Sequence, residues 1–216
     1  MEHIPKKEVY SPYDISKICQ VALSDVLQWI EQARLSFFVV PGGHKRIRHC
    51  HLEKFLTENH YPVPQNWNET FEKFRVLVVE DDQDLLEIVA ELLHEESRLE
   101  VRTEDHGFSA GLQIASWHPD LILLDFLMPG MTGFEVCKRL RKNSEIQDIP
   151  VLAVTSLATV ENKRAVMESG VSDFLGKPFH SEELLNKVRI LLGMSTNGVY
   201  QPESGSSHSR NPQSSS

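Results

Sequence analysis

Three short runs of the chain are apolar at every position rather than at alternate positions. These runs are residues 76–79 (VLVV), 121–124 (LILL) and 151–154 (VLAV). A strand with only one buried face alternates polar and apolar residues, so continuous runs predict strands covered on both faces, as in a parallel sheet between helices. Leu85, Val89 and Leu92, between two of the runs, have the spacing of a helix face. Strand and helix alternate about five times, which predicts an α/β fold with a doubly wound, five-stranded parallel sheet.

Polar side chains follow these runs at the points where the predicted strands end. They are Glu80, Asp81, Asp125, Thr155 and, after a fourth run (DFLG), Lys177. The carboxyl ends of parallel strands share one edge of the sheet, so we expect these side chains to converge. Carboxylates that meet in this way repel each other unless a cation lies among them, and an all-oxygen ligand set favours Mg²⁺. Asp125 can then act as a nucleophile toward a phosphoryl group, whose oxygens would contact Lys177 and the Thr155 hydroxyl.

Residues 75–192 resemble the receiver domain of two-component response regulators. The motifs that carry the resemblance are Glu80-Asp81, Asp125 followed by Met128-Pro129-Gly130, Thr155, and Lys177-Pro178. The resemblance implies a flavodoxin-like fold in which Asp125 accepts a phosphoryl group from a sensor histidine kinase or a phosphotransfer protein. It also implies that Asp81, Asp125 and the backbone carbonyl of Leu127 bind Mg²⁺, with Glu80 acting through water.

The same resemblance implies that Thr155 and Phe174 form a switch pair. In this family the hydroxyl moves toward the phosphoryl group, and the aromatic ring turns inward behind it. No hydrolase, transferase or cyclase motif follows the receiver-like segment. We therefore expect no enzymatic activity beyond Mg²⁺-dependent phosphorylation and dephosphorylation of the receiver itself.

Residues 8–60 form a separate unit, in which short helical patterns flank a Pro-Gly-Gly turn. This stretch resembles the winged helix-turn-helix of the MerR and excisionase families. Tyr10, the pair Trp29-Ile30 and the segment 41–48 (PGGHKRIR) carry the resemblance. In those families the second helix enters the major groove and the wing follows the DNA backbone. The candidate DNA contacts are Gln28, His44, Lys45, Arg46 and Arg48.

One feature of the predicted second helix departs from these families. Its exposed face offers Asp25, Gln28 and Glu31 rather than basic residues, which is unfavourable beside a phosphate backbone. Two hypotheses therefore stay open. The protein is either a phosphorylation-controlled transcription regulator, in which phosphorylation can pair two copies as a homodimer, or an adaptor whose N-terminal domain binds a protein partner.

Composition sets the remaining boundaries. Residues 61–73 are rich in Pro and Asn and are predicted to be a linker to the receiver domain at 74–194, and residues 195–216 are predicted to be a disordered tail. The net charge is −9, with 21 acidic and 13 basic residues in 73–194 against 9 and 8 in 1–72, so the acidity belongs to the receiver-like part. Three widely spaced cysteines and no apolar run of signal-peptide or membrane length predict a soluble cytoplasmic protein with no membrane partner.

Overall fold

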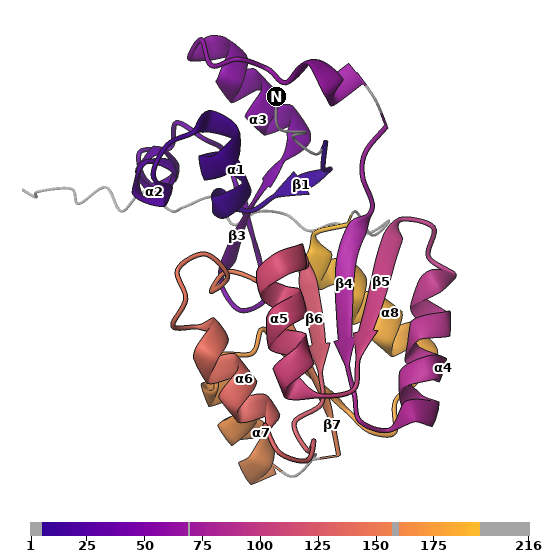
Figure 1. The fold of residues 1–216 in the computed structure, drawn as a ribbon. Coiled ribbons are helices and arrows are strands. Elements are labelled where there is room, and N and C mark those ends of the chain that lie inside the picture. The colour runs from indigo at the N-terminus through magenta and orange to yellow at the C-terminus, as the bar shows by residue number, and fades with distance from the viewer. Residues whose placement is uncertain (1–5, 69, 157–159, 195–216) are drawn as a thin grey trace, which may run out of the picture.

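The computed structural model describes residues 6–68, 70–156 and 160–194, and the predicted tail at 195–216 lies outside these residues. Two parts are visible in Figure 1: an N-terminal module of helices and short strands, and a larger α/β part. Within the described residues, no helix combines the length and the apolar character needed to cross a bilayer.

The N-terminal module contains three helices and a three-stranded antiparallel sheet of order β1-β3-β2. Its elements are β1 (Val9–Tyr10), α1 (Pro12–Cys19), α2 (Leu23–Glu31), β2 (Phe38–Val40), β3 (His44–Arg48) and α3 (His49–Glu58). Gly42 and Gly43 both have positive φ in the turn between β2 and β3, a conformation that glycine adopts without strain. The β2–β3 hairpin, here called the wing, stands where the sequence predicts a hairpin.

The segment predicted as a linker packs against the module along part of its length. Tyr61 stacks with Phe55 at 6.2 Å between ring centroids, and a short 3₁₀ helix, η1 (Gln65–Asn68), follows. Trp67 in that helix is buried and lies 4.6 Å from His49, centroid to centroid. These contacts fix the path of the chain from the module to the first strand of the α/β part.

The α/β part confirms the predicted doubly wound sheet. Its five strands are parallel in the order β5-β4-β6-β7-β8. The elements in chain order are β4 (Phe74–Val79), α4 (Gln83–His94), β5 (Leu99–Glu104), α5 (Gly107–Trp117), β6 (Leu121–Leu124), α6 (Gly133–Leu140), β7 (Val151–Thr155), α7 (Val160–Glu168), β8 (Asp173–Gly176) and α8 (Ser181–Leu192). Every residue of β6 and β7 is buried, as their continuous apolar sequences predict.

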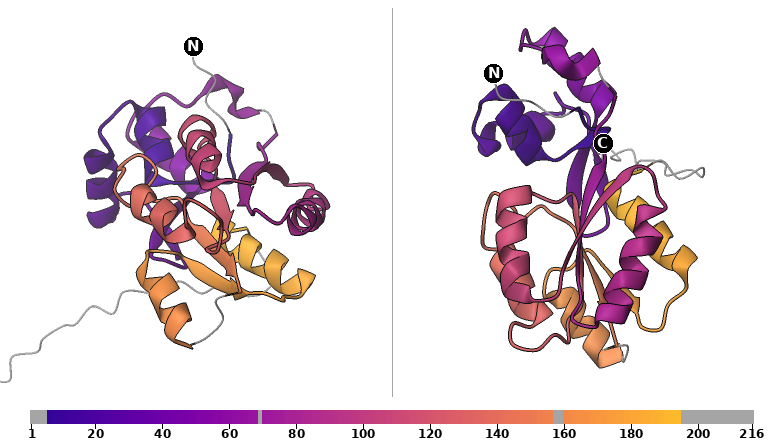
Figure 2. Two further views of the ribbon diagram at one scale, coloured as in Figure 1. Left: turned by 60° about the horizontal axis from the view of Figure 1, so that its bottom comes forward. Right: turned by 45° about the vertical axis from the view of Figure 1, so that its right-hand side comes forward.

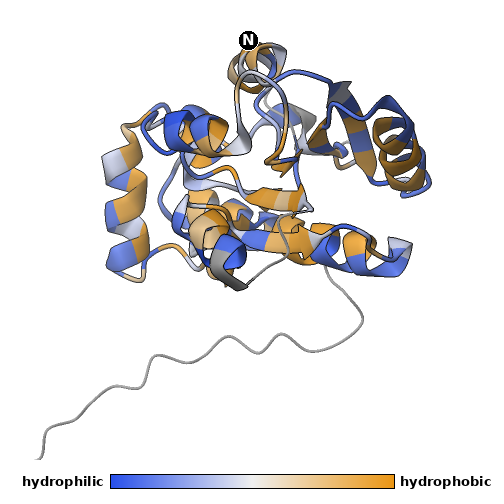
Figure 3. Ribbon diagram, turned by 90° about the horizontal axis from the view of Figure 1, so that it is seen from below, coloured by the Kyte–Doolittle hydropathy of each residue, from blue (hydrophilic) through white to orange (hydrophobic). Residues whose placement is uncertain are grey.

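Helices cover both faces of this sheet, as the two views of Figure 2 show. Alternate residues of the central strands point to opposite faces of the sheet. Leu121 and Leu123 pack with α4 and α8 on one face. Ile122 and Leu124 pack with α5, α6 and α7 on the other face. Figure 3 shows the apolar strands enclosed between helices that carry their polar residues outward. The core therefore consists of two apolar layers that hold the strand ends in fixed positions.

The N-terminal module lies against the edge of the sheet where the strands begin. In Figure 1 the arrows of β4 and β6 point away from the module, so the carboxyl ends of the strands lie at the opposite edge. The module and the predicted site at the strand ends are therefore on opposite sides of the α/β part.

Candidate functional site

The candidate site lies at the carboxyl edge of the sheet, where four strands end. Glu80 follows β4, Asp125 follows β6, Thr155 is the last residue of β7, and Lys177 follows β8. Because β4, β6, β7 and β8 are neighbours in the sheet, the fold brings these residues together from distant parts of the sequence. The Asp125 amide donates a hydrogen bond to the Val79 carbonyl at 2.9 Å, which continues the strand ladder by one residue and fixes the backbone beneath the carboxylate.

Lys177 joins the two buried carboxylates of the site. Its Nζ lies 2.8 Å from Asp125 Oδ2 and 2.6 Å from Glu80 Oε2. The second oxygen of Asp125, Oδ1, accepts a hydrogen bond from the Leu127 amide at 3.0 Å. Each oxygen of Asp125 thus has a donor, and the carboxylate is held in one orientation.

Burial and hydrogen bonding move the pKa values of these groups in different directions. Burial raises the pKa of Glu80 to about 7, although Lys177 partly opposes the shift. Burial would also raise the pKa of Asp125, but hydrogen bonds from Lys177 and the Leu127 amide outweigh it and lower that pKa. Burial would lower the pKa of Lys177, and the bonds to Asp125 and Glu80 raise it instead. Asp125 is therefore the carboxylate that is ionised, as a nucleophile must be.

Three carboxylates at this edge fit the ligand set of a hard divalent cation. Glu80, Asp81 and Asp125 each offer an oxygen atom, and these atoms all lie within 4.8 Å of one another. Asp81 is exposed, so the group is open to solvent on one side, as Mg²⁺ with its retained waters requires. Binding of Mg²⁺ by the backbone carbonyl of Leu127 stays a prediction.

The predicted switch residues lie on the two strands next to the site. Thr155 is fully buried and pairs with Gly176 across β7 and β8. Phe174 pairs with Ala153 in the same ladder, and its half-buried ring lies 5.7 Å beneath the Lys163 ammonium. The two residues are thus placed on adjacent strands, and their movement stays a prediction.

Two of the candidate DNA contacts lie against the α/β part in the structure. His44 and Arg46 are 8% and 6% exposed, and both face the α/β part. His44 Nε2 lies 2.7 Å from the Ser172 hydroxyl, and Arg46 donates to the Asp148 carbonyl at 3.0 Å. Alternate residues of a strand share one face, and the α/β part covers this face of β3.

The other candidate DNA contacts remain accessible to different degrees. Gln28 is exposed on α2. Lys45 is half-buried, with its ammonium 6.0 Å above the Phe37 ring, and half-buried Arg48 lies 4.7 Å above the Phe38 ring. The wing therefore offers less free positive charge than its sequence suggests.

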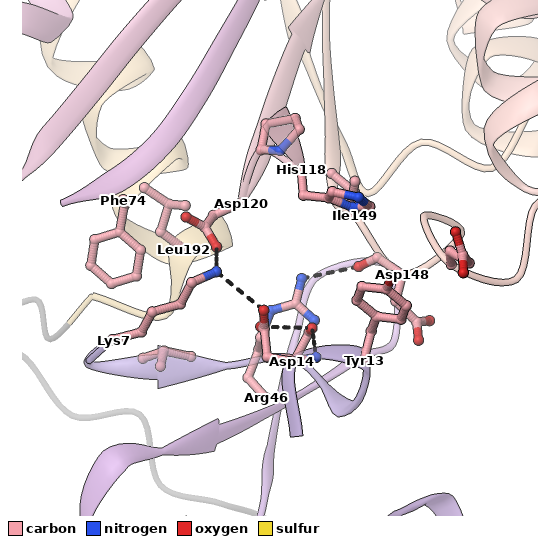
Figure 4. Close-up of a pocket in the computed structure, with 14 residues that line it drawn as sticks. Lys7, Tyr13, Asp14, Arg46, Phe74, His118, Asp120, Asp148, Ile149 and Leu192 are labelled. Atoms are coloured by element: carbon pink, nitrogen blue, oxygen red, sulfur yellow. Dashed lines mark hydrogen bonds and ion pairs between the residues drawn. The ribbon is translucent and has the colours of Figure 1, made fainter. Parts of the chain in front are cut away.

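An ionic cluster between the module and the α/β part has no counterpart among the predicted site residues. Lys7 Nζ lies 2.8 Å from Asp120 Oδ1 and 3.2 Å from Asp14 Oδ1, beside a small cavity of about 40 Å³ (Figure 4). Burial would lower the pKa of Lys7, but the two carboxylates raise it, so the ammonium stays charged. No local sequence signal marks these residues, because the cluster forms only when the two parts meet.

Comparison with known proteins agrees with this geometry. Residues 76–189 match the family model of the response regulator receiver domain. The chain is 38% identical over 118 residues to the DNA-binding dual master transcriptional regulator RpaA of Synechocystis sp., covering 55% of this chain and 48% of that protein. It is 34% identical over 118 residues to the phosphate regulon transcriptional regulatory protein PhoB of Escherichia coli, covering 55% and 51%. The chain thus spans about half the length of the curated relatives it matches.

Solved structures show the same relationship for the α/β part. A putative response regulator from Chloroflexus aurantiacus is 33% identical with a TM-score of 0.54, and the match covers 56% of this chain and 99% of that one. The chemotaxis response regulator CheY4 of Vibrio cholerae is 31% identical with a TM-score of 0.52, covering 55% and 98%. The family model covers more than half of the chain, and the strand order β5-β4-β6-β7-β8 is that of a flavodoxin-like sheet. The chain belongs to the response regulator receiver family.

Proposed function

We propose that this response regulator accepts a phosphoryl group on Asp125 from a sensor histidine kinase or a phosphotransfer protein, in the presence of Mg²⁺. The observation that carries the proposal is the fixed, ionised carboxylate of Asp125, with Lys177 at 2.8 Å from one of its oxygens. A lone pair on an oxygen of the Asp125 carboxylate attacks phosphorus, an acyl phosphate bond forms, and the P–N bond to the donor imidazole breaks, so that the imidazole leaves.

The residues around Asp125 orient the reaction rather than exchange protons. The Leu127 amide fixes the orientation of the Asp125 carboxylate. The Lys177 ammonium is close enough to Asp125 to stabilise the negative charge of the phosphoryl oxygens as the group is transferred. Thr155 would contact the phosphoryl group from the end of β7. Bound Mg²⁺ would neutralise the acidic cluster and the incoming phosphoryl charge. We propose no further enzymatic activity for the chain.

Incubation with acetyl phosphate and Mg²⁺, followed by intact-mass measurement, tests this function. The wild-type protein should gain one phosphoryl group, and Asp125→Asn should gain none. Asp84→Asn removes the same charge from an exposed position in the first turn of α4 and should behave as wild type. Equal labelling of Asp125→Asn and wild type would refute the proposal.

For the output of the protein, we infer that the N-terminal module is a winged helix-turn-helix of the MerR and excisionase type that binds DNA. Two observations support this: the three helices and the wing follow one another in the predicted order, and the relatives RpaA and PhoB are named as transcriptional regulators. A mobility-shift titration at two salt concentrations tests it, since phosphate contacts make affinity fall steeply with salt. Gel filtration of the phosphorylated protein tests homodimer formation.

Binding of a protein partner is the second candidate output, and the buried face of the wing favours it. His44 and Arg46 are occupied by the receiver, and α2 contains no Lys or Arg. The exposed residues of α2 include Gln28 and Glu31, which suit a polar protein surface better than a phosphate backbone. Loss of every DNA shift at low salt, together with phosphorylation-dependent pulldown of a protein, would decide for this adaptor function.

A further inference from the structure

The end of α6 carries a group of basic residues that the site at the strand ends does not use. Four of the five residues at 138–142 (KRLRK) are basic. Val136 and Leu140 are buried against the sheet, so the helix positions between them face solvent. The three exposed cations, here called the α6 basic cluster, are Lys138, Arg139 and Lys142.

Arg141, the fourth basic residue of this segment, holds the end of α6 in place. Its Nε donates to the Gly170 carbonyl at 2.8 Å, and its Nη1 donates to the Ile149 carbonyl at 2.9 Å. The Arg141 backbone is helical, and the Lys142 amide donates to the Arg139 carbonyl at 3.2 Å. Lys142 therefore lies about one helical turn beyond Lys138, on a backbone that Arg141 fixes.

The α6 basic cluster differs from the other cations of the receiver in its lack of acidic partners. Most of the other Lys and Arg residues in 73–194 form ion pairs, for example Arg102 with Glu100 and Arg164 with Glu168. Among residues 6–68, 70–156 and 160–194, no acid pairs with a cation of the cluster. The cluster is thus unpaired in a domain that has 21 acidic and only 13 basic residues.

The helix dipole accounts for only part of this pattern. The negative end of the dipole favours cations in the last turn of any helix. The last turns of α1, α4 and α8 each contain one basic residue, whereas that of α6 contains two and Lys142 follows. The additional positive charge has no structural role among the described contacts, so it is available to a partner.

The cluster lies at the edge of the sheet where the N-terminal module packs. Because α6 follows β6 in a parallel sheet, it runs back from the carboxyl edge to the edge where the strands begin. The loop after α6 contains Asp148, whose carbonyl accepts from Arg46 Nη2 at 3.0 Å, and Arg46 Nη1 donates to the Lys45 carbonyl at 2.9 Å. Lys45 and the α6 basic cluster therefore border the same loop of the receiver.

The module by itself offers few cations to DNA. His44 and Arg46 are buried, α2 contains no Lys or Arg, and Lys54 pairs with Glu58. A form of the protein that binds DNA in this arrangement therefore needs positive charge from another surface. Contact with phosphates requires only positive charge and hydrogen-bond donors, which the α6 basic cluster provides.

We propose that the α6 basic cluster contacts the phosphate backbone of DNA beside Lys45, so that the receiver itself forms part of the DNA-binding surface. The inference rests on the DNA-binding output proposed above and adds to it a second set of phosphate contacts. The module and the receiver then bind DNA together, in the arrangement that the structure shows.

Removal of the positive charges tests the proposal through the salt dependence of DNA binding. We expect Lys138→Gln/Arg139→Gln/Lys142→Gln to bind a mixed-sequence duplex at least about tenfold more weakly than wild type at low salt. Fluorescence anisotropy with the full-length proteins measures this. The slope of log K against log salt should become shallower by about 2 to 3, because each phosphate contact contributes about 0.9. An unchanged slope would overturn the inference.

Two matched variants separate the position of the charges from their number. The first, Arg102→Gln/Arg164→Gln/Arg189→Gln, removes three cations that pair with acids elsewhere on the receiver, and it should change the slope by less than about 1 because distant charges are screened. The second, Lys138→Arg/Arg139→Lys/Lys142→Arg, keeps the charges of the cluster and should bind as wild type. A loss in the first variant as large as that in the cluster variant would overturn the inference.

Lysine acetylation locates the DNA on the folded wild-type protein. Bound DNA should slow the reaction of Lys138 and Lys142 with acetic anhydride, together with that of Lys45, as measured by peptide mass spectrometry. Lys163, exposed on α7, should react at the same rate with and without DNA. Protection of Lys45 without protection of Lys138 and Lys142 would overturn the inference and leave DNA binding by the module intact.

The outcomes distinguish this inference from the proposed function. If the wild-type protein bound no DNA at low salt, the DNA-binding output and this inference would both be overturned, while phosphorylation of Asp125 would stand. If wild type and the cluster variant bound DNA with the same affinity and slope, only the contribution of the receiver would be overturned. If the cluster variant lost affinity for phosphatidylglycerol vesicles but not for DNA, the cluster would bind a lipid surface, and the inference would be wrong.

Discussion

Lys177 Nζ and Asp125 Oδ2 are 2.8 Å apart, and the same ammonium lies 2.6 Å from Glu80. When all three carboxylates of Glu80, Asp81 and Asp125 are ionised, Lys177 balances one of them, which leaves two formal negative charges. This is the charge that one Mg²⁺ ion balances. Lys177 therefore reduces the repulsion between the buried carboxylates of Glu80 and Asp125. The negative charge that remains still favours binding of a divalent cation.

Replacement of Lys177 by Met should destabilise the receiver. Glu80 and Asp125 would lose their shared cation, and we expect the free energy of unfolding to fall by roughly 1–3 kcal/mol, less than for a fully buried pair because Lys177 is partly exposed. Added Mg²⁺ should restore part of the loss. Urea unfolding with and without Mg²⁺ measures both effects. Lys142→Met, at an exposed position, should change stability by less than about 0.5 kcal/mol, and an equal loss in this control would contradict the argument.

The receiver fold and its site could be predicted from the sequence because both depend on local patterns. Continuous apolar runs such as 121–124 report burial on both faces, and the edge shared by parallel strand ends brings Asp125, Glu80, Thr155 and Lys177 together. No pairing between distant residues had to be known in advance. The five-stranded parallel sheet of the structure agrees with these predictions, and Glu80, Asp81 and Asp125 lie together.

The attachment of the module could not be predicted in the same way. His44 and Ser172 are 128 positions apart, and Lys7 and Asp120 are 113 positions apart, so no periodicity links them. A basic hairpin has the same sequence pattern whether it faces DNA or a protein. The sequence therefore predicts the hairpin that the structure contains, but it carries no signal that the side chains of His44 and Arg46 face the receiver.

We expect Lys7 to contribute to the stability of the contact between the N-terminal module and the α/β part. In Lys7→Met, the carboxylates of Asp14 and Asp120 would be left without their cation, and we expect a loss of roughly 1–3 kcal/mol in the free energy of unfolding, because both acids are partly exposed. Lys54→Met is the matched control, because Lys54 pairs with Glu58 on the exposed surface of α3 and should change stability by less than about 1 kcal/mol. Chemical unfolding at neutral pH measures both, and similar losses would show that Lys7 is not buried between two acids.

The buried His44 predicts a specific dependence of stability on pH. Its pKa is about 3 in the folded protein and about 6.5 in the unfolded chain, so only the unfolded chain binds a proton between these values. The contribution of His44 to stability is therefore complete above pH 6.5 and is lost as the pH falls toward 3. Between pH 7 and 5.5 the loss should be roughly 1 kcal/mol.

A comparison with His44→Gln isolates this contribution from the titration of the acidic residues. Unfolding free energies measured at pH 7 and 5.5 should fall more in the wild-type protein than in His44→Gln, because glutamine does not titrate. The same decrease in both proteins would mean that His44 is as accessible to protons in the folded protein as in the unfolded chain.

The absence of a side chain at Gly133 lets the first turn of α6 lie close to the backbone of Asp125. A Cβ atom at this position would lie 2.8 Å from the Asp125 carbonyl oxygen and 2.7 Å from a ring carbon of Phe126, whereas a Cβ atom at Gly111 in α5 would meet nothing within 4 Å. Gly133→Ala should therefore cost roughly 1–3 kcal/mol of stability and slow phosphorylation by acetyl phosphate, because the backbone that carries Asp125 must move. Gly111→Ala should instead stabilise the protein by roughly 0.5–1 kcal/mol, since alanine favours a helix interior, and leave phosphorylation unchanged. If both variants were phosphorylated at the wild-type rate, the close approach of α6 would play no part in positioning Asp125.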